Sequence, residues 1–135
     1  MTYEEPDIPG ASNVTEWFGR WPTFHDAEVL SIIMQRSGES RVAICAFETT
    51  SEVDGSGRYV LAKQAVVTFV LDGFPQDQYG ITNTRVEFFN HQNVLSSAAV
   101  NRRTEGYELV LEGCHGVDAS LLCKHMRVEL VPVSS

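Results

Sequence analysis

The sequence predicts one α+β domain, in which a predominantly antiparallel, twisted β-sheet that can curl into a half-barrel carries one short N-terminal helix. Runs rich in β-branched and apolar residues recur along the chain, and polar turn residues bound each run. Side chains in residues 107–112 alternate as they do in a strand. Near the N-terminus, apolar residues instead recur at three- and four-residue intervals, which is the period of a helix.

A chain of 135 residues matches a single domain, because domains cluster near 100–150 residues. Residues 1–12 contain Pro6, Pro9 and Gly10 and few apolar side chains, so we expect a flexible N-terminal arm there. Residues 13–135 are then the folded domain.

The predicted helix begins at Asn13, which with Glu16 has the spacing of a capping box, and it ends at Gly19 and Pro22. Its apolar positions at helical spacing are Val14, Trp17, Phe18 and Trp21. A helix this short is not stable alone, so we expect its tryptophan face to pack on the sheet.

Residues 27–34 and 41–50 are predicted to form a hairpin. A loop at 51–57 follows, in which Asp54 and the glycine after it are a turn signal. The run at 59–71 carries apolar side chains on both faces, which predicts a central strand that is covered on both sides.

After a further loop, residues 84–89 are predicted to form a strand, and the polar residues 90–93 interrupt pairing. Residues 94–102 fit a strand or a helical turn by periodicity, and their length and neighbours favour the strand. Residues 107–112 and 122–130 complete a total of six or seven strands.

The formal net charge of −8 argues against nucleic acid as a direct ligand, because neutralising phosphates requires clustered lysine and arginine. Apolar runs are too short for a membrane span, so we expect a soluble protein that does not bind membranes. Acidic residues in loops and at strand ends have two interpretations, a solvated edge that discourages aggregation or a surface that meets a basic partner. These acidic residues are Glu48, Glu52, Asp54, Asp72 and Asp77.

The N-terminal residues lack the features of a secretory signal, so we expect an intracellular, cytoplasmic protein. The three cysteines, Cys45, Cys114 and Cys123, form no CxxC pair, and we expect reduced, buried thiols.

The adjacent His25 and Asp26 invite a metal-binding or acid–base interpretation, since both are metal ligands and a carboxylate can orient an imidazole. The interpretation we favour is structural, with Asp26 accepting backbone N–H groups in a turn and His25 donating to a carbonyl. A metal site built from His25, His91 and His115 stays open, although the spacing gives no HxH or HExxH pattern. No sequence motif for acyl transfer or for a phosphate loop is present.

The block WFGRWPTFHDAEV at residues 17–29 resembles the opening signature of the immunity protein 50 family of bacterial polymorphic toxin systems. Residues 89–94, residues 113–118 and Cys123 resemble the later pattern of that family more loosely. The resemblance implies a cytoplasmic antidote that binds and blocks a cognate toxin, and it brings no catalytic residues, metal or cofactor with it. Residues 17–29 then serve the fold, through Trp17, Trp21, Phe24, His25 and Asp26.

Two other functions stay open beside an immunity protein. One is a small metal-binding or enzymatic domain that uses His25 and Asp26. The other is an oligomerising structural module, in which an uncovered sheet pairs with a second copy as a homodimer. Dimerisation is compatible with immunity.

Overall fold

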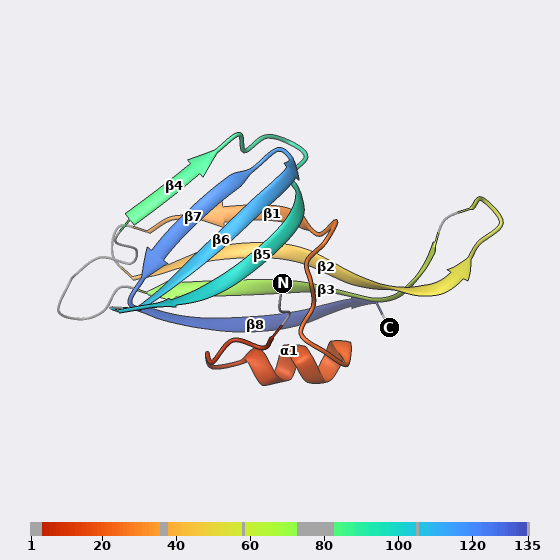
Figure 1. Cartoon of the computed structure of the whole chain (residues 1–135), viewed down its shortest axis with the longest axis horizontal. Helices are drawn as coiled ribbons and strands as arrows, with labels where there is room; N and C mark the ends of the chain where they lie inside the picture. The colour runs from red at the N-terminus through yellow and green to blue at the C-terminus, as the bar shows by residue number, and fades with distance from the viewer. Residues whose placement is uncertain (1–3, 36–37, 58, 73–82, 105, 135) are drawn as a thin grey trace.

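The computed structural model describes residues 4–35, 38–57, 59–72, 83–104 and 106–134. One helix and eight strands form in this part of the chain. Their bounds are α1 Ala11–Phe18, β1 Glu28–Ile33, β2 Glu39–Val53, β3 Tyr59–Asp72, β4 Asn83–Glu87, β5 Val94–Arg103, β6 Gly106–His115, β7 Asp118–Cys123 and β8 His125–Ser134. All strand pairs are antiparallel, in the order β4-β7-β6-β5-β1-β2-β3-β8 (Figure 1). The predicted fold class is confirmed.

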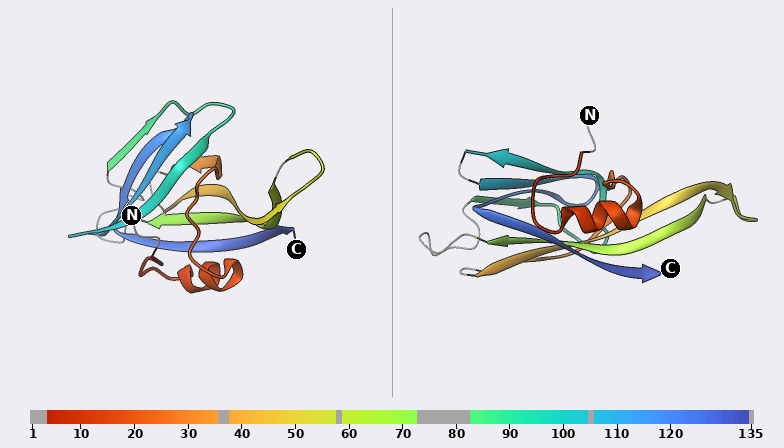
Figure 2. Two further views of the ribbon diagram at one scale, coloured as in Figure 1. Left: turned by 45° about the vertical axis from the view of Figure 1, so that its right-hand side comes forward. Right: turned by 90° about the horizontal axis from the view of Figure 1, so that it is seen from below.

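The sheet is open, with β4 and β8 as its edges, and it is strongly curled. Figure 2 shows the half that contains β5, β6 and β7 leaning over the half that contains β2, β3 and β8, with α1 beside β8. The chain passes between the two halves within one residue, because Lys124 alone separates β7 from β8. The backbone N–H of Lys124 donates to the carbonyl of Asp72 at 3.1 Å, which ties this corner to the end of β3.

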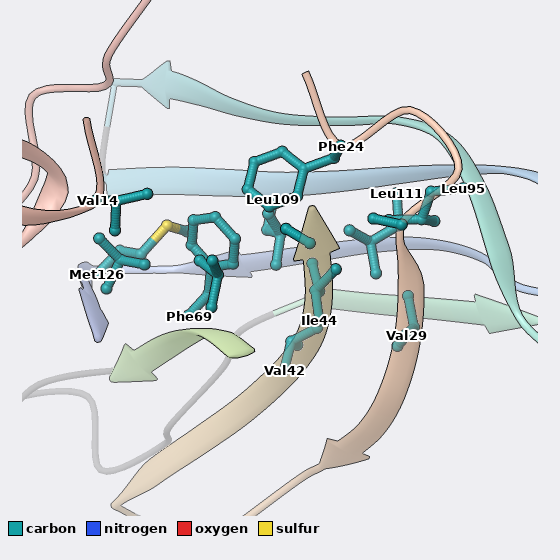
Figure 3. Packing of buried hydrophobic residues seen from close by; sticks show 14 of the residues in the cluster. Val14, Phe24, Val29, Val42, Ile44, Phe69, Leu95, Leu109, Leu111 and Met126 are labelled. Carbon is teal, nitrogen blue, oxygen red and sulfur yellow. The ribbon is translucent and has the colours of Figure 1, made fainter. Parts of the chain in front are cut away.

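The hydrophobic core fills the space between the two halves of the sheet (Figure 3). Its aromatic centre is Phe69 of β3, whose ring centroid lies 6.3 Å from that of Trp21 and 6.0 Å from that of Phe24. Trp21 and Phe24 belong to the segment between α1 and β1. That segment therefore inserts aromatic rings into the core and joins the helix to the sheet.

Helix α1 begins two residues earlier than predicted, at Ala11, with Gly10 as its N-cap residue. The predicted capping box at Asn13 is wrong, because Asn13 lies within the first turn. The buried face consists of Ala11, Val14 and Phe18, while Trp17 is half-buried. The helix ends as predicted at Gly19, where a positive φ of 90° lets the N–H reach the carbonyl of Thr15 at 2.8 Å. No helix in the described residues has the length and apolar character needed to cross a membrane.

The expected N-terminal arm differs from the structure from Ile8 onward. Ile8 is buried in the core, and the carbonyl of Pro9 accepts a hydrogen bond from the N–H of Val128 at 2.9 Å. This bond uses an outward N–H of the edge strand β8. The segment before α1 thus covers part of an edge that would otherwise present unpaired backbone groups.

Gly10 permits the close approach of this segment to β8. A Cβ atom at Gly10 would lie 1.9 Å from the carbonyl oxygen of Val128, and its φ of 89° is unfavourable for other residues. We expect Gly10→Ala to cost roughly 2 kcal/mol or more of unfolding free energy, measured by urea titration.

Two other glycines separate the causes of this loss. Gly19→Ala places a Cβ atom at a residue that already has a positive φ, but this Cβ makes no close contact. We expect it to cost only about 1 kcal/mol of unfolding free energy. Gly55→Ala involves neither a positive φ nor a close contact and should stay within about 0.5 kcal/mol. An equal loss at Gly10 and Gly19 would contradict the contact with Val128.

The strand count exceeds the predicted six or seven because the last predicted strand, residues 122–130, contains the end of one strand, β7, and the first part of another, β8. Residues before Lys124 pair with β4 and β6, whereas those after it pair with β3. The buried positions shift from odd numbers, ending at Cys123, to even numbers, beginning at Met126. That phase change is the sequence signal that reveals the corner.

Several local predictions are confirmed. Residues 94–102 form a strand, the paired strand β5. The turn at Asp54 is present, with the N–H of Gly57 donating to the carbonyl of Asp54 at 3.0 Å. The strand predicted at 59–71 is an interior strand that pairs with β2 and β8, but it lies next to the edge of the sheet instead of at its centre. Its outer face is only partly covered, because Val66 and Thr68 are half-buried and Val70 is buried. Val70 is buried there between Arg41 and Arg127 of the neighbouring strands.

Four charged side chains form a network over Val70. Arg41 lies 3.0 Å from Glu129 and 3.2 Å from Glu39, and Arg127 pairs with the same two carboxylates. Hydrogen bonding from Arg127 holds the pKa of Glu39 below its ordinary value, and hydrogen bonding from Arg41 does the same for Glu129. The ion pairs also raise the pKa of Arg127.

Lowered carboxylate pKa values stabilise the folded state above the ordinary pKa near 4.5, and this stabilisation is lost as the pH falls through the folded values. We therefore expect Glu39→Gln to flatten the decrease in melting temperature between about pH 5 and pH 3. At pH 7 it should cost no more than about 1 kcal/mol, because the pairs are partly solvated. Glu16→Gln, on the exposed side of α1, is the control. An unchanged acid slope in Glu39→Gln would contradict the network.

Candidate functional site

Asn93 joins three segments at one end of the sheet, through its buried side chain and its backbone carbonyl. Asn93 is only 3% exposed, and its Oδ1 accepts hydrogen bonds from the N–H groups of Asn90 at 2.9 Å and Val117 at 3.2 Å. Its Nδ2 donates to the carbonyl of Asn90 at 2.6 Å. Its own carbonyl accepts the N–H of Val29 at 2.8 Å. Asn93 thus ties β1, the loop after β4 and the β6–β7 hairpin together.

We call the surface around Asn93 the knotted end, after the hydrogen bonds that join its segments and not after a topological knot. It is defined as residues 23–28, 87–93 and 112–118. Figure 1 shows the loop after β4 beside the β6–β7 hairpin, near the start of β5. The three segments that carry the family resemblance, residues 17–29, 89–94 and 113–118, meet here. Most of the resembling segments thus converge at one end of the fold, whereas Trp17 in α1 and Cys123 at the end of β7 lie elsewhere.

In the turn at residues 23–28, some side chains of the block that resembles the family point into the core and others point into solvent. Phe24 and Asp26 both have positive φ, 61° and 65°. The N–H of His25 donates to Thr23 Oγ1 at 3.2 Å. The N–H of Asp26 donates to the carbonyl of Leu95 at 2.8 Å, which fixes the turn to β5. This geometry points the ring of Phe24 inward to Trp21 and Phe69.

His25 and Asp26 point outward instead, with side chains that are 67% and 58% exposed. Their Nε2 and Oδ2 atoms lie 3.6 Å apart. The expectation that His25 donates to a carbonyl is wrong, because its imidazole faces Asp26 and solvent. The Asp26 contact that holds the turn comes from its backbone N–H, and its carboxylate stays available to a partner.

Loop 88–93 displays two phenylalanines that the predicted strand 84–89 had included. Strand β4 ends at Glu87, and Phe88 adopts a positive φ of 60°. Phe88 is 69% exposed and Phe89 is 45% exposed. The carbonyl of Phe88 accepts a hydrogen bond from Nδ2 of Asn90 at 3.0 Å. Two adjacent phenylalanines at a strand end point to opposite faces of the sheet, which is a sequence signal that one ring can face solvent.

The β6–β7 hairpin packs against the same loop. Gly116 has φ of 87°, and a Cβ atom there would lie 2.5 Å from the carbonyl oxygen of Gln92. Asp118 Oδ1 accepts the N–H of Gly113 at 2.9 Å, which fixes the hairpin. Cys114 and His115 are exposed on it. The backbone can approach the loop this closely only because residue 116 has no side chain.

The metal interpretation finds no support in the arrangement of the histidines. Within the described residues, no group of three or more His, Cys, Asp or Glu side chains is placed to hold a metal ion. His25, His91 and His115 all belong to the knotted end, but they do not form such a group.

The expectation that all three cysteine thiols are buried is wrong for Cys114. Cys45 is half-buried and Cys123 is buried, whereas Cys114 is exposed. Burial raises the pKa of the Cys123 thiol to about 12, so it stays protonated at neutral pH and is a poor nucleophile.

The acidic residues predicted to meet a partner do not form one surface. Glu48, Glu52 and Asp54 belong to the long β2–β3 hairpin, which projects from the body in Figure 1. Glu48 pairs with Arg20 at 3.3 Å, and Asp54 Oδ1 accepts the N–H of Ser56 at 2.9 Å.

The other two predicted acids lie elsewhere or outside the described residues. Asp72 is at the opposite end of β3, roughly 40 Å along the strand from Tyr59. There it lines a cavity of about 400 Å³ with Tyr107 and Arg127. Asp77 lies outside the described residues.

Trp17, the first residue of the signature, lies where α1 meets the base of the β2–β3 hairpin. Its ring contacts that of Phe18 edge-on at a centroid distance of 4.9 Å. The ammonium of Lys63 lies 5.3 Å from the Trp17 ring centroid and donates to the Trp17 carbonyl. Trp17 thus braces the helix against β3, apart from the knotted end.

Comparison with known proteins gives one match, to a family model. No curated protein and no solved structure matches the chain. A family model described as Immunity protein 50 matches residues 10–134. Since this match covers nearly the whole chain, the chain belongs to the Immunity protein 50 family.

Proposed function

We propose that this protein binds and neutralises a cognate bacterial toxin in the cytoplasm, by occluding a surface of the toxin and without catalysing a reaction. The family match over residues 10–134 is the observation that carries this proposal. The knotted end supports it, because it presents side chains on loops that are fixed by hydrogen bonds. Fixed loops lose little conformational entropy on binding.

Acidic residues would provide long-range electrostatic attraction between this protein and the toxin. A net charge of −8 favours encounter with a basic partner, and such attraction acts mainly on the association rate. Glu48, Glu52 and Asp54 on the projecting hairpin remain predicted partner contacts, as do Asp72 and Asp77. Their contribution should decrease with added salt, because exposed charges are screened.

Co-expression with the product of the neighbouring toxin gene tests the proposal. We expect the two proteins to elute together in size-exclusion chromatography. We also expect the complex to elute intact in 0.5 M NaCl if apolar contacts determine its dissociation rate. Separate elution of two folded proteins, at concentrations well above micromolar, would remove the proposed function.

A further inference from the structure

Phe88 and Phe89 form an exposed aromatic pair at the tip of the knotted end. A phenylalanine buries at least about 150 Å² when it is fully covered, and Phe88 still exposes 69% of its surface and Phe89 45%. Phenylalanine is among the aromatic residues that are enriched in protein interfaces, and buried anchor residues carry most of the binding energy there. Neither ring belongs to the described hydrophobic core or to the partly buried residues packed against it.

The backbone at this end is strained as well as ordered. Among the described residues, the non-glycine residues with positive φ are Phe24, Asp26 and Phe88, and all three belong to the knotted end. Phenylalanine is poorly suited to this conformation, whereas asparagine and glycine adopt it readily. For Phe24 the buried ring accounts for the choice, but the ring of Phe88 lies in solvent. Strain at an exposed aromatic residue indicates a use outside the fold.

The loop that holds the pair is rigid through the Asn93 hydrogen bonds. The N–H of Gln92 also donates to Asn90 Oδ1 at 2.8 Å. Residues 88–93 are therefore prepared for contact before a partner arrives, which lowers the entropic cost of binding.

The formally charged residues of the knotted end are all acidic when its histidines are counted as neutral at pH 7. The three segments of the knotted end contain five acidic residues and no lysine or arginine. The five acids are Asp26, Glu28, Glu87, Glu112 and Asp118. Glu87 is balanced in part by Arg85 of β4 at 2.6 Å, just outside these segments. An apolar centre with an acidic rim is complementary to an apolar pocket with a basic rim.

We propose that Phe88 and Phe89 anchor the complex, by entering an apolar pocket rimmed by basic groups on the cognate toxin. This inference rests on the proposed function and makes it specific, because it assigns the central contact to the knotted end. The acidic β2–β3 hairpin then contributes to encounter more than to the lifetime of the complex.

The test compares the affinities of variants for the purified toxin domain of the neighbouring gene, measured by biolayer interferometry. We expect Phe88→Asn and Phe89→Ser each to weaken binding at least tenfold, mainly through faster dissociation. Phe88→Asn should melt at the same temperature as the wild type or higher, because asparagine tolerates the positive φ. Val131→Asn, at an equally exposed apolar residue of β8, is the matched control and should bind within twofold of the wild type.

The possible results distinguish failure of this inference from failure of the proposed function. If the wild type binds the toxin and both phenylalanine variants bind it equally well, this inference is wrong and the proposed function stands. If the wild type itself does not bind, the proposed function fails. Light scattering tests whether the pair instead contacts a second copy of this chain. If Phe88→Asn loses a homodimer while its toxin affinity is unchanged, the pair serves self-association and the inference is overturned.

Discussion

Phe69→Ala should destabilise the protein by about 3–5 kcal/mol, which is a large part of the total stability of a domain this size. Phe69 is 1% exposed, and its ring joins those of Trp21 and Phe24. Removing it leaves a cavity between the sheet and the segment that links α1 to β1. Urea titration followed by tryptophan fluorescence measures this loss, and it also reports on the loosened Trp21.

Phe47→Ala is the matched control, because Phe47 lies on a neighbouring strand but is only half-buried. Its loss should be less than half that of Phe69→Ala. If the two substitutions cost the same, the aromatic cluster is not the centre of the core, and the helix is held by other contacts.

Asn93→Ala should cost about 2–4 kcal/mol, although it removes no apolar packing. The substitution leaves the N–H groups of Asn90 and Val117 without their acceptor, and Val117 is fully buried. An unsatisfied buried N–H is expensive because water cannot replace the lost bond. Thermal and urea unfolding measure the effect.

Asn13→Ala provides the comparison at an exposed asparagine of α1. We expect no loss there and a gain of a few tenths of a kcal/mol, since alanine is the better helix former. A loss near 1 kcal/mol would instead restore the capping role that the sequence predicted for Asn13. If Asn93→Ala is as mild as this control, the three loops are held by their backbones and not by Asn93.

The sheet was predictable because strand formation leaves a local pattern. Alternation in residues 107–112 and the apolar run at 59–71 both identify strands from the order of neighbouring residues alone. The division at Lys124 was missed, because its signal is a change of phase that is visible only when odd and even positions are compared separately. Topology across the sheet depends on contacts between distant residues and has no such local signature.

The candidate site was less predictable, for the same reason. Asn93 bonds to Val117, which lies 24 residues away, so its role is invisible in the polar cluster 90–93. His25 and Asp26 attracted notice as a chemical pair, yet the turn is held by backbone groups and by the ring of Phe24. Phe88 depends on a backbone angle that residue identity does not predict, since phenylalanine rarely adopts it.

The most direct test of the account is inhibition of the neighbouring-gene toxin by increasing amounts of the purified protein. We expect toxin activity to fall linearly and to reach its minimum at one molecule of protein per toxin, at toxin concentrations above the dissociation constant. Phe88→Asn should move the curve to higher concentration. Full toxin activity in the presence of a large excess of folded wild-type protein would contradict the account.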